Sequence, residues 1–175
     1  HFGLDPISVA GALIQNIGNF GSDKRLVGAS TITQQVAKNF LLTNETSMER
    51  KFKEAILAIR IEDTFSKNRI LELYLNEIYL GYRSYGVAAA ALNYFNKSLD
   101  ELDLAEAAYL AALPKAPNNY HPAKEYDAAV ARRDWVLSQM VENGKISGEE
   151  ADIAMLVPLR TAKRDQEEYV QADYF

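Results

Sequence analysis

The sequence contains no cysteine and only two histidines, His1 and His121. Without cysteine the chain cannot form disulfides, use a thiol nucleophile or build a cysteine-ligated zinc site. His121 lies in the segment NYHP, with no second histidine or acidic residue at ligand spacing. We therefore interpret it as a structural loop histidine, and no metal ligand is predicted.

Long hydrophobic runs are also absent. No segment approaches the roughly 20 apolar residues that span a bilayer, and no signal peptide is recognisable. Since the sequence begins at His1, we expect a fragment or processed form whose membrane anchor, if any, lies outside it. With 175 residues, 48% of them hydrophobic, the chain is long enough for one domain with its own core.

Positive charge is scarce overall, with 19 Lys and Arg against 24 Asp and Glu, a net charge of −5. Nonspecific nucleic-acid binding needs a broad cationic surface, so nucleic-acid partners are not expected. The cations are nevertheless concentrated: residues 24–60 hold seven cations and three acids, a net of +4, which leaves −9 on the remainder. A basic island in an acidic chain favours a specific anionic ligand.

Apolar periodicity predicts helices nearly throughout and no strand longer than two or three residues, which indicates an all-α fold. After Pro158 the sequence becomes polar and charged, so residues 1–158 are predicted to form one domain and residues 159–175 a domain edge or the start of a linker. The expected helices cover residues 6–17, 47–65, 70–80 with Gly81 as its cap, 85–95, 98–113, 123–143 and 148–155.

Ser98 and Glu101 have the spacing of a capping box before the helix that runs to Leu113, and Pro114 and Pro117 are expected to break that helix, so that LPKAPNNYHP forms an extended loop. In the helix from 123 to 143 the residues expected to be buried are Val130, Trp135, Leu137 and Met140.

The segment GASTITQQVAK, residues 28–38, has the pattern of a helix start. Thr31 and Gln34 show the spacing of a capping box, with Ser30 as an alternative cap. Helix starts attract anions, and Lys38 would extend an anion site along the face that Thr31 and Gln34 share. The alternative is an ordinary capped helix whose lysine extends into water.

The segment RKFKEAILAIR, residues 50–60, lies on the helix expected from 47 to 65. Met48, Phe52, Ile56 and Ile59 recur at helical spacing and are predicted to form its buried stripe. Arg50, Lys53, Glu54 and Leu57 then fall on another face. That face is either part of an anion site or a solvated surface with an Arg50–Glu54 ion pair.

These two segments, with three others, resemble the motifs of the peptidoglycan glycosyltransferase domain of class A penicillin-binding proteins, glycosyltransferase family fifty-one. GASTITQQ is similar to its second motif and RKFKE to its third, R-K-x-x-E. ILELYLNEIYLG, residues 70–81, and EAAYLAALPKAPNNYHP, residues 106–122, resemble the fourth and fifth motifs. The opening HFGLD, residues 1–5, is similar to the end of the first motif, E-D-x-x-F-x-x-H-x-G-x-D.

The resemblance implies a lysozyme-like helical fold with a large lobe and a smaller membrane-facing lobe. It implies polymerisation of lipid II, in which the 4-hydroxyl of an incoming disaccharide attacks the anomeric carbon of a growing glycan and undecaprenyl pyrophosphate leaves. The implied partners are lipid II, the growing strand, the membrane surface on its periplasmic side and moenomycin-type inhibitors. A divalent cation such as magnesium remains an open possibility.

The resemblance also implies roles for individual residues. The general base is the glutamate that opens the first motif, which would precede His1, so this chain alone is expected to be inactive. Glu54 would orient cations and substrate. Thr46 stands where many members have a basic residue, with Lys53 as a possible compensation. The donor's phosphate or sugar would be bound by six residues: Ser30, Gln34, Gln35, Lys38, Arg50 and Lys51.

Two alternatives to the transferase and one membrane question remain open at this point. A lysozyme-like glycan-cleaving enzyme shares the expected fold, and a non-catalytic module would bind the lipid pyrophosphate without turnover. Asn76 and Lys115 are candidate substrate contacts with commoner structural roles. The stripe with Leu13 and Phe20 is expected either in a membrane-facing surface or in the core.

Overall fold

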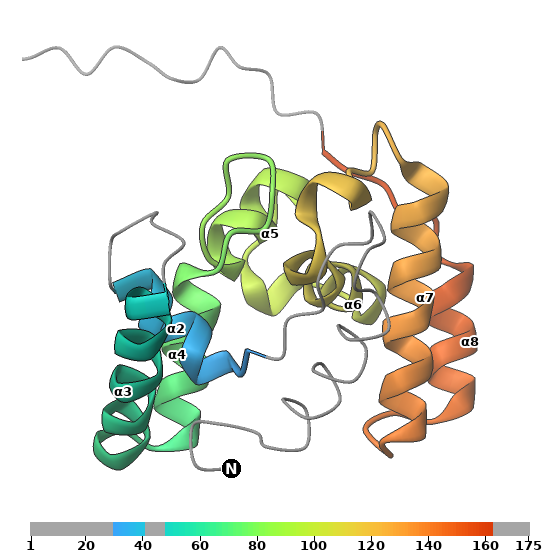
Figure 1. The fold of residues 1–175 in the computed structure, drawn as a ribbon. Helices are drawn as coiled ribbons and strands as arrows, with labels where there is room; N and C mark the ends of the chain where they lie inside the picture. Colours follow the sequence, from blue (N-terminus) through green and yellow to red (C-terminus); the bar gives the residue numbers. More distant parts are fainter. Residues whose placement is uncertain (1–29, 41–47, 163–175) are drawn as a thin grey trace, which may run out of the picture. The chain divides into compact units, whose positions relative to one another are not determined.

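The computed structural model describes residues 30–40 and 48–162, and within them the regular structure is helical (Figure 1). One isolated bridge between Tyr79 and Tyr85 is the sole β pairing in these two stretches. The all-α prediction is therefore confirmed. The chain divides into two units, one ending at Glu77 and one beginning at Ile78, and each is described by itself. No helix in the described stretches is both long and apolar enough to cross a bilayer.

The first unit contains α2 (Ile32–Phe40), α3 (Met48–Thr64) and α4 (Lys67–Glu77). Apolar side chains from all three helices fill the space between them. The buried apolar residues are Val36 and Ala37 on α2, Ala58 and Ile61 on α3, and Ile70 and Tyr74 on α4. The expected helix from 6 to 17, with Leu13 and Phe20, lies outside the described residues, as do His1 and Thr46.

The helix expected from 70 to 80 begins earlier, at Lys67, and ends earlier, at Glu77. The next residues form a turn in which Leu80 N–H donates to Ser84 O and Gly86 N–H donates to Ile78 O. Gly81 has a φ of 81°, and a Cβ there would lie 2.8 Å from the Tyr94 hydroxyl oxygen. Gly81 is therefore required by this turn and does not cap the helix.

The second unit contains α5 (Val87–Phe95), α6 (Leu104–Ala112), α7 (Tyr126–Glu142) and α8 (Gly148–Leu156). Its core is aromatic, because Tyr94, Phe95 and Tyr109 pack edge-to-face or tilted at centroid separations of 5.6 to 6.3 Å. Tyr94 donates its hydroxyl to Leu80 O and Tyr109 to Tyr120 O, which satisfies both buried hydroxyls.

The loops before and after α6 differ from expectation. The Ser98–Glu101 capping box exists, but it caps the short 3₁₀ turn η1 (Leu99–Glu101), and α6 has its own box from Asp103 and Glu106. The segment expected to be an extended loop forms two further 3₁₀ turns, η2 (Leu113–Lys115) and η3 (Pro117–Tyr120). The prolines stop the helix as expected, yet they are compatible with single turns.

Helices α7 and α8 lie side by side (Figure 1). The small side chains of α8, Ala151 and Ala154, pack with alanines of α6 and with Leu137 of α7. Leu137 is fully buried as expected, whereas Trp135 is exposed, with the Arg132 guanidinium 3.9 Å from its ring centroid. The fully buried Arg133 donates to Val157 O at 2.6 Å and to Met155 O at 3.0 Å. Arg133 thereby satisfies carbonyls at the end of α8 that the helix itself leaves unpaired.

Candidate functional site

The start of α2 forms the capping box that the sequence predicts. Thr31 N–H donates to Gln34 Oε1 at 2.8 Å, and Gln34 N–H donates to Thr31 Oγ1 at 3.2 Å. This box fixes the first turn of the helix, whose positive dipole end favours a nearby negative charge. It also occupies the side chain of Gln34, which is buried.

Lys51 joins the start of α2 to α3. Its Nζ donates to Ser30 Oγ at 3.0 Å and contacts Glu54 Oε1 at 2.5 Å. The Glu54 side chain is only 2% exposed, whereas the Lys51 side chain is 48% exposed. A buried carboxylate thus holds a half-exposed ammonium next to a helix start.

The alternative interpretation of this face of α3, a solvated surface with an Arg50–Glu54 ion pair, is wrong in its details. Glu54 is buried and does not belong to a solvated surface. Its ion-pair partner among the described contacts is Lys51 one turn earlier, and Lys53 pairs instead with Glu49 at 2.6 Å. Arg50 is half-buried.

The buried stripe expected on α3 is also wrong. Phe52 is 69% exposed, and Ile56 and Ile59 are exposed as well. The face that packs against α2 and α4 carries Glu54, Ala58 and Ile61 instead, spaced four and three residues apart. Periodicity located two faces correctly, but the more apolar one points away from the unit's core.

A second contact, which sequence reasoning missed, ties α2 to α3. Glu62 accepts hydrogen bonds from the buried Thr33 hydroxyl and from Lys67 Nζ. Burial alone would raise the pKa of Glu62, but the hydrogen bonds from Lys67 and Thr33 outweigh it, and the pKa is lowered. Glu62 lies two helical turns after Glu54, so extending the Glu54 face along α3 would have indicated it.

The structure thus brings three of the seven predicted site residues into direct contact, namely Ser30, Lys51 and Glu54. Gln34 serves the helix cap, Gln35 is half-buried, and Lys38 is exposed in the last turn of α2. The two secondary candidates, Asn76 and Lys115, are both exposed.

His121 has a structural environment, as the sequence predicts. Its Nδ1 accepts from Ala123 N–H at 3.2 Å, and its ring meets the Tyr82 ring edge-on at 5.8 Å between centroids. Among residues 30–40 and 48–162, no cluster of three His, Asp or Glu side chains is arranged to hold a metal ion.

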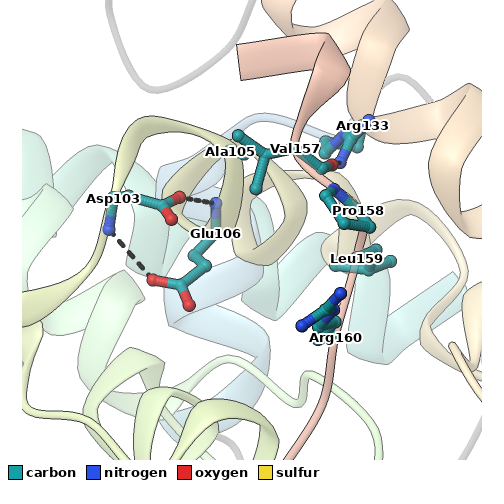
Figure 2. Close-up of a pocket in the computed structure, with 8 residues that line it drawn as sticks. All are labelled: Asp103, Ala105, Glu106, Arg133, Val157, Pro158, Leu159 and Arg160. Carbon is teal, nitrogen blue, oxygen red and sulfur yellow. Dashed lines mark hydrogen bonds between the residues drawn. The ribbon is translucent and has the colours of Figure 1, made fainter. Parts of the chain in front are cut away.

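A cavity of about 370 Å³ lies elsewhere, in the second unit (Figure 2). Asp103, which caps α6, and Glu106 of α6 lie on one side of it, and Pro158, Leu159 and Arg160 lie on the other. None of the seven predicted site residues lines this cavity. The candidate anion site and the cavity are therefore separate features of the chain.

Comparison with known proteins gives consistent matches, of which a family model and two relatives are described first. A family model described as Transglycosylase matches residues 1–141. Penicillin-binding protein 1A of Rickettsia bellii is 53% identical over all 175 residues, and that of Aquifex aeolicus is 50% identical over 175 residues. The chain spans 22% and 23% of these two relatives, about a fifth of their length.

A solved structure agrees with these sequence matches. The crystal structure of penicillin-binding protein 1A from Haemophilus influenzae superposes with a TM-score of 0.52 and 39% identity. The superposition covers 78% of this chain and 18% of that one.

Proposed function

Since the chain belongs to the transglycosylase family, as a peptidoglycan glycosyltransferase domain of a class A penicillin-binding protein, we propose that it elongates glycan strands from lipid II and releases undecaprenyl pyrophosphate. The observation that carries this proposal is the contact of Lys51 with both Ser30 and Glu54. It joins the second and third sequence motifs at one point, beside a helix start.

The geometry at Lys51 suits a departing pyrophosphate. An ammonium has three N–H donors, and two of them are engaged by Ser30 and Glu54. The third is left for a phosphate oxygen, and charge-assisted contacts of this kind contribute roughly 1.5 to 3 kcal/mol. The positive end of the α2 dipole adds to the attraction. Charge that develops on the leaving group is therefore stabilised without rearrangement of the site.

Glu54 acts in this proposal as a positioning residue. Its carboxylate is buried and in contact with Lys51, so we assign it to holding the ammonium and not to taking a proton from the incoming sugar hydroxyl. Ser30 fixes the same ammonium from the side of α2. We assign Gln35, Lys38 and Arg50 to the donor's remaining phosphate and sugar oxygens, and Gln34 to the support of the helix start.

The exposed apolar face of α3 suits a lipid-linked donor. Phe52, Ile56 and Ile59 occupy consecutive turns of the helix that also carries Lys51 and Glu54. An amphipathic helix of this type lies in the membrane interface with its apolar side towards the acyl chains. The face would place the anion site close to the bilayer surface, where the pyrophosphate of lipid II resides.

Donor binding and turnover together test the proposal. Moenomycin affinity is measured for the chain, for Lys51→Ala and for Lys145→Ala, and we expect Lys51→Ala to weaken binding by about tenfold or more. Lys145 is the control, because it is an exposed lysine of the second unit and is not one of the predicted site residues. Equal effects of the two substitutions would show general charge attraction and refute the assigned site.

Turnover is measured with lipid II, using the chain preceded by the E-D-x-x-F segment of the first motif. Polymer growth supports the transferase. Shortening of preformed glycan would favour the lysozyme-like alternative, and donor binding with no turnover would favour a binding module.

Vesicle binding tests the apolar face of α3. Phe52→Ser is expected to lower co-sedimentation with anionic vesicles, whereas Leu99→Ser, which changes an exposed side chain of the second unit, is the control. Equal losses in the two variants would remove the membrane role from α3.

A further inference from the structure

A small cavity of the second unit is lined largely by aromatic rings. Its volume is about 130 Å³, and the residues that line it include Tyr82, Tyr94 and His121. The Tyr82 ring lies 5.7 Å from the Tyr94 ring and 5.8 Å from the His121 ring, centroid to centroid. Tyr94 is buried, whereas Tyr82 is 48% exposed. Tyr82 therefore supplies the solvent-facing ring of an aromatic pocket, which we call the Tyr82 pocket.

The backbone that carries Tyr82 is strained and held in place. Tyr82 has a φ of 48° and Arg83 a φ of 56°, in the left-handed region that residues other than glycine rarely adopt. The Ser84 hydroxyl donates to Tyr82 O at 3.3 Å and accepts from Asn93 Nδ2 at 3.0 Å, which ties the turn to α5. Strained backbone persists where the surrounding contacts enforce it, and such positions concentrate at functional sites. The turn thus fixes the Tyr82 ring at the pocket.

Three polar groups of the Tyr82 pocket have no hydrogen-bond partner within the part of the chain that the structure describes. His121 Nδ1 accepts from Ala123 N–H at 3.2 Å. The proton of the neutral imidazole is therefore on Nε2, which no described residue engages. The hydroxyls of Tyr82 and Thr161, which also line the pocket, have no partner among the described residues either. The pocket thus combines aromatic walls with a few groups that can bind a ligand through hydrogen bonds.

The size and chemistry of the Tyr82 pocket select its occupant. An apolar cavity of about 150 Å³ takes up one benzene molecule, so this pocket has room for about one six-membered ring. The described residues that line it include no Lys, Arg, Asp or Glu, so neither an anion nor a cation finds a counter-charge there. A wholly apolar group, such as a proline ring, would leave the His121 and Tyr82 donors unpaired. A sugar ring meets both requirements, because its C–H groups pack on aromatic faces and its polar groups form hydrogen bonds.

We propose that the Tyr82 pocket binds one N-acetylated sugar ring of a glycan strand. The inference rests on the proposed function, which makes a strand of N-acetylated sugars the substrate. The sugar ring packs on the exposed part of Tyr82, and its acetamido oxygen accepts from His121 Nε2–H. Its hydroxyls meet Tyr82 and Thr161. The pocket is in this way an uncharged contact for the strand, in addition to the charged contacts of the pyrophosphate.

Chitotetraose, a tetramer of N-acetylglucosamine, tests the proposal because it carries the sugar rings without lipid, peptide or pyrophosphate. Titration of the whole chain should shift the NMR signals of the Tyr82 ring and of His121 Nε2 in a saturable way. Cellotetraose, which lacks the acetamido groups, should bind about tenfold more weakly. Absence of shifts at these two rings, equal affinity for the two tetramers, or displacement of chitotetraose by a polyproline peptide would each overturn the proposal.

Substitutions on the same turn provide a matched comparison. Tyr82→Asn removes the ring and keeps the turn, because Asn tolerates the left-handed region, and it should weaken chitotetraose binding by about tenfold. His121→Phe keeps a ring and removes the Nε2 donor, and a similar loss is expected. Tyr85→Asn is the control, since Tyr85 is 66% exposed and does not line the pocket. Equal losses in Tyr82→Asn and Tyr85→Asn would contradict the proposal, and thermal unfolding confirms that the variants remain folded.

Lys51→Ala separates this inference from the proposed function. It should weaken moenomycin binding and leave the shifts that chitotetraose causes in the Tyr82 and His121 rings unchanged, because the tetramer has no pyrophosphate. If the rings shift although Lys51→Ala does not affect moenomycin, the donor site fails and the Tyr82 pocket stands. If moenomycin responds and the rings do not shift, the assignment of the pocket alone fails.

Discussion

The Lys51–Glu54 pair predicts an asymmetric response to substitution. Lys51→Met leaves the Glu54 carboxylate buried and removes the ammonium that lies 2.5 Å from it. Removing one member of a buried ion pair costs about 3 to 5 kcal/mol, because the remaining charge is desolvated and uncompensated. Glu54→Gln leaves instead an ammonium that is half in water, and a neutral amide of nearly the same volume in the buried position. We expect that variant to lose about 1 to 2 kcal/mol.

A double variant isolates the cause of this asymmetry. Replacing both members, as Lys51→Met with Glu54→Leu, removes the buried charge together with its partner, and stability should return to within about 1 kcal/mol of the unmodified chain. Urea unfolding followed by far-ultraviolet circular dichroism gives the free energies. If Glu54→Gln costs as much stability as Lys51→Met, the carboxylate is not desolvated in the way its burial indicates, and the reasoning fails. Donor affinity should fall in all three variants, because each one displaces or removes the ammonium.

Three other predictions concern stability. The pKa of Glu62 is lowered in the folded chain, so the stability that its ionised form contributes is present above its ordinary pKa of 4.5 and is lost as pH falls through the lower folded value. The urea midpoint of Glu62→Gln should therefore depend less on pH, between neutral and acid pH, than the midpoint of the unmodified chain. Arg133→Met should cost about 2 to 4 kcal/mol in urea unfolding, since it leaves the carbonyls of Met155 and Val157 unpaired, and an unchanged midpoint would contradict this role. Gly81→Ala should lower the melting temperature, because the added Cβ would sit at a φ of 81° and 2.8 Å from the Tyr94 hydroxyl oxygen. A melting temperature equal to that of the unmodified chain would contradict the described turn.

Local signals in the sequence were reliable guides to this fold. The capping boxes of Thr31 with Gln34 and of Ser98 with Glu101 both exist, because such boxes depend on residues only three positions apart. The length of the helical segment after a box is set less locally. The turn after Ser98 ends at Glu101, since Asp103 begins a separate helix with a cap of its own.

Predictions that depend on distant contacts were weaker. Periodicity separated the two faces of α3, but it could not show that Ala58 and Ile61 pack inward while Phe52 faces outward, because that choice depends on what surrounds the helix. The early end of α4 also depends on contacts that periodicity does not show, because the bridge between Tyr79 and Tyr85 takes the place of a further helical turn.

In the candidate site, too, local signals were predicted correctly and contacts between distant residues were not. The residues of the two motifs were identified by resemblance, and the cap at α2 by spacing. The contact between Lys51 and Ser30 joins positions 21 residues apart, which no local pattern indicates. Glu62 was missed because its partner Thr33 lies 29 residues away.

The double attachment of α2 has a consequence for the entropy of binding. Ser30 and Thr33 are each held by a side chain of α3, and Lys51 is itself held from two sides. A lysine that is free to rotate must be ordered when it meets a ligand, at a cost of about 0.5 to 1.5 kcal/mol. Here that ordering takes place during folding, so an arriving anion meets an ammonium and a helix start already in position. Calorimetry should accordingly show a smaller entropic penalty for the unmodified chain than for Ser30→Ala, in which one of the two restraints on the ammonium is gone.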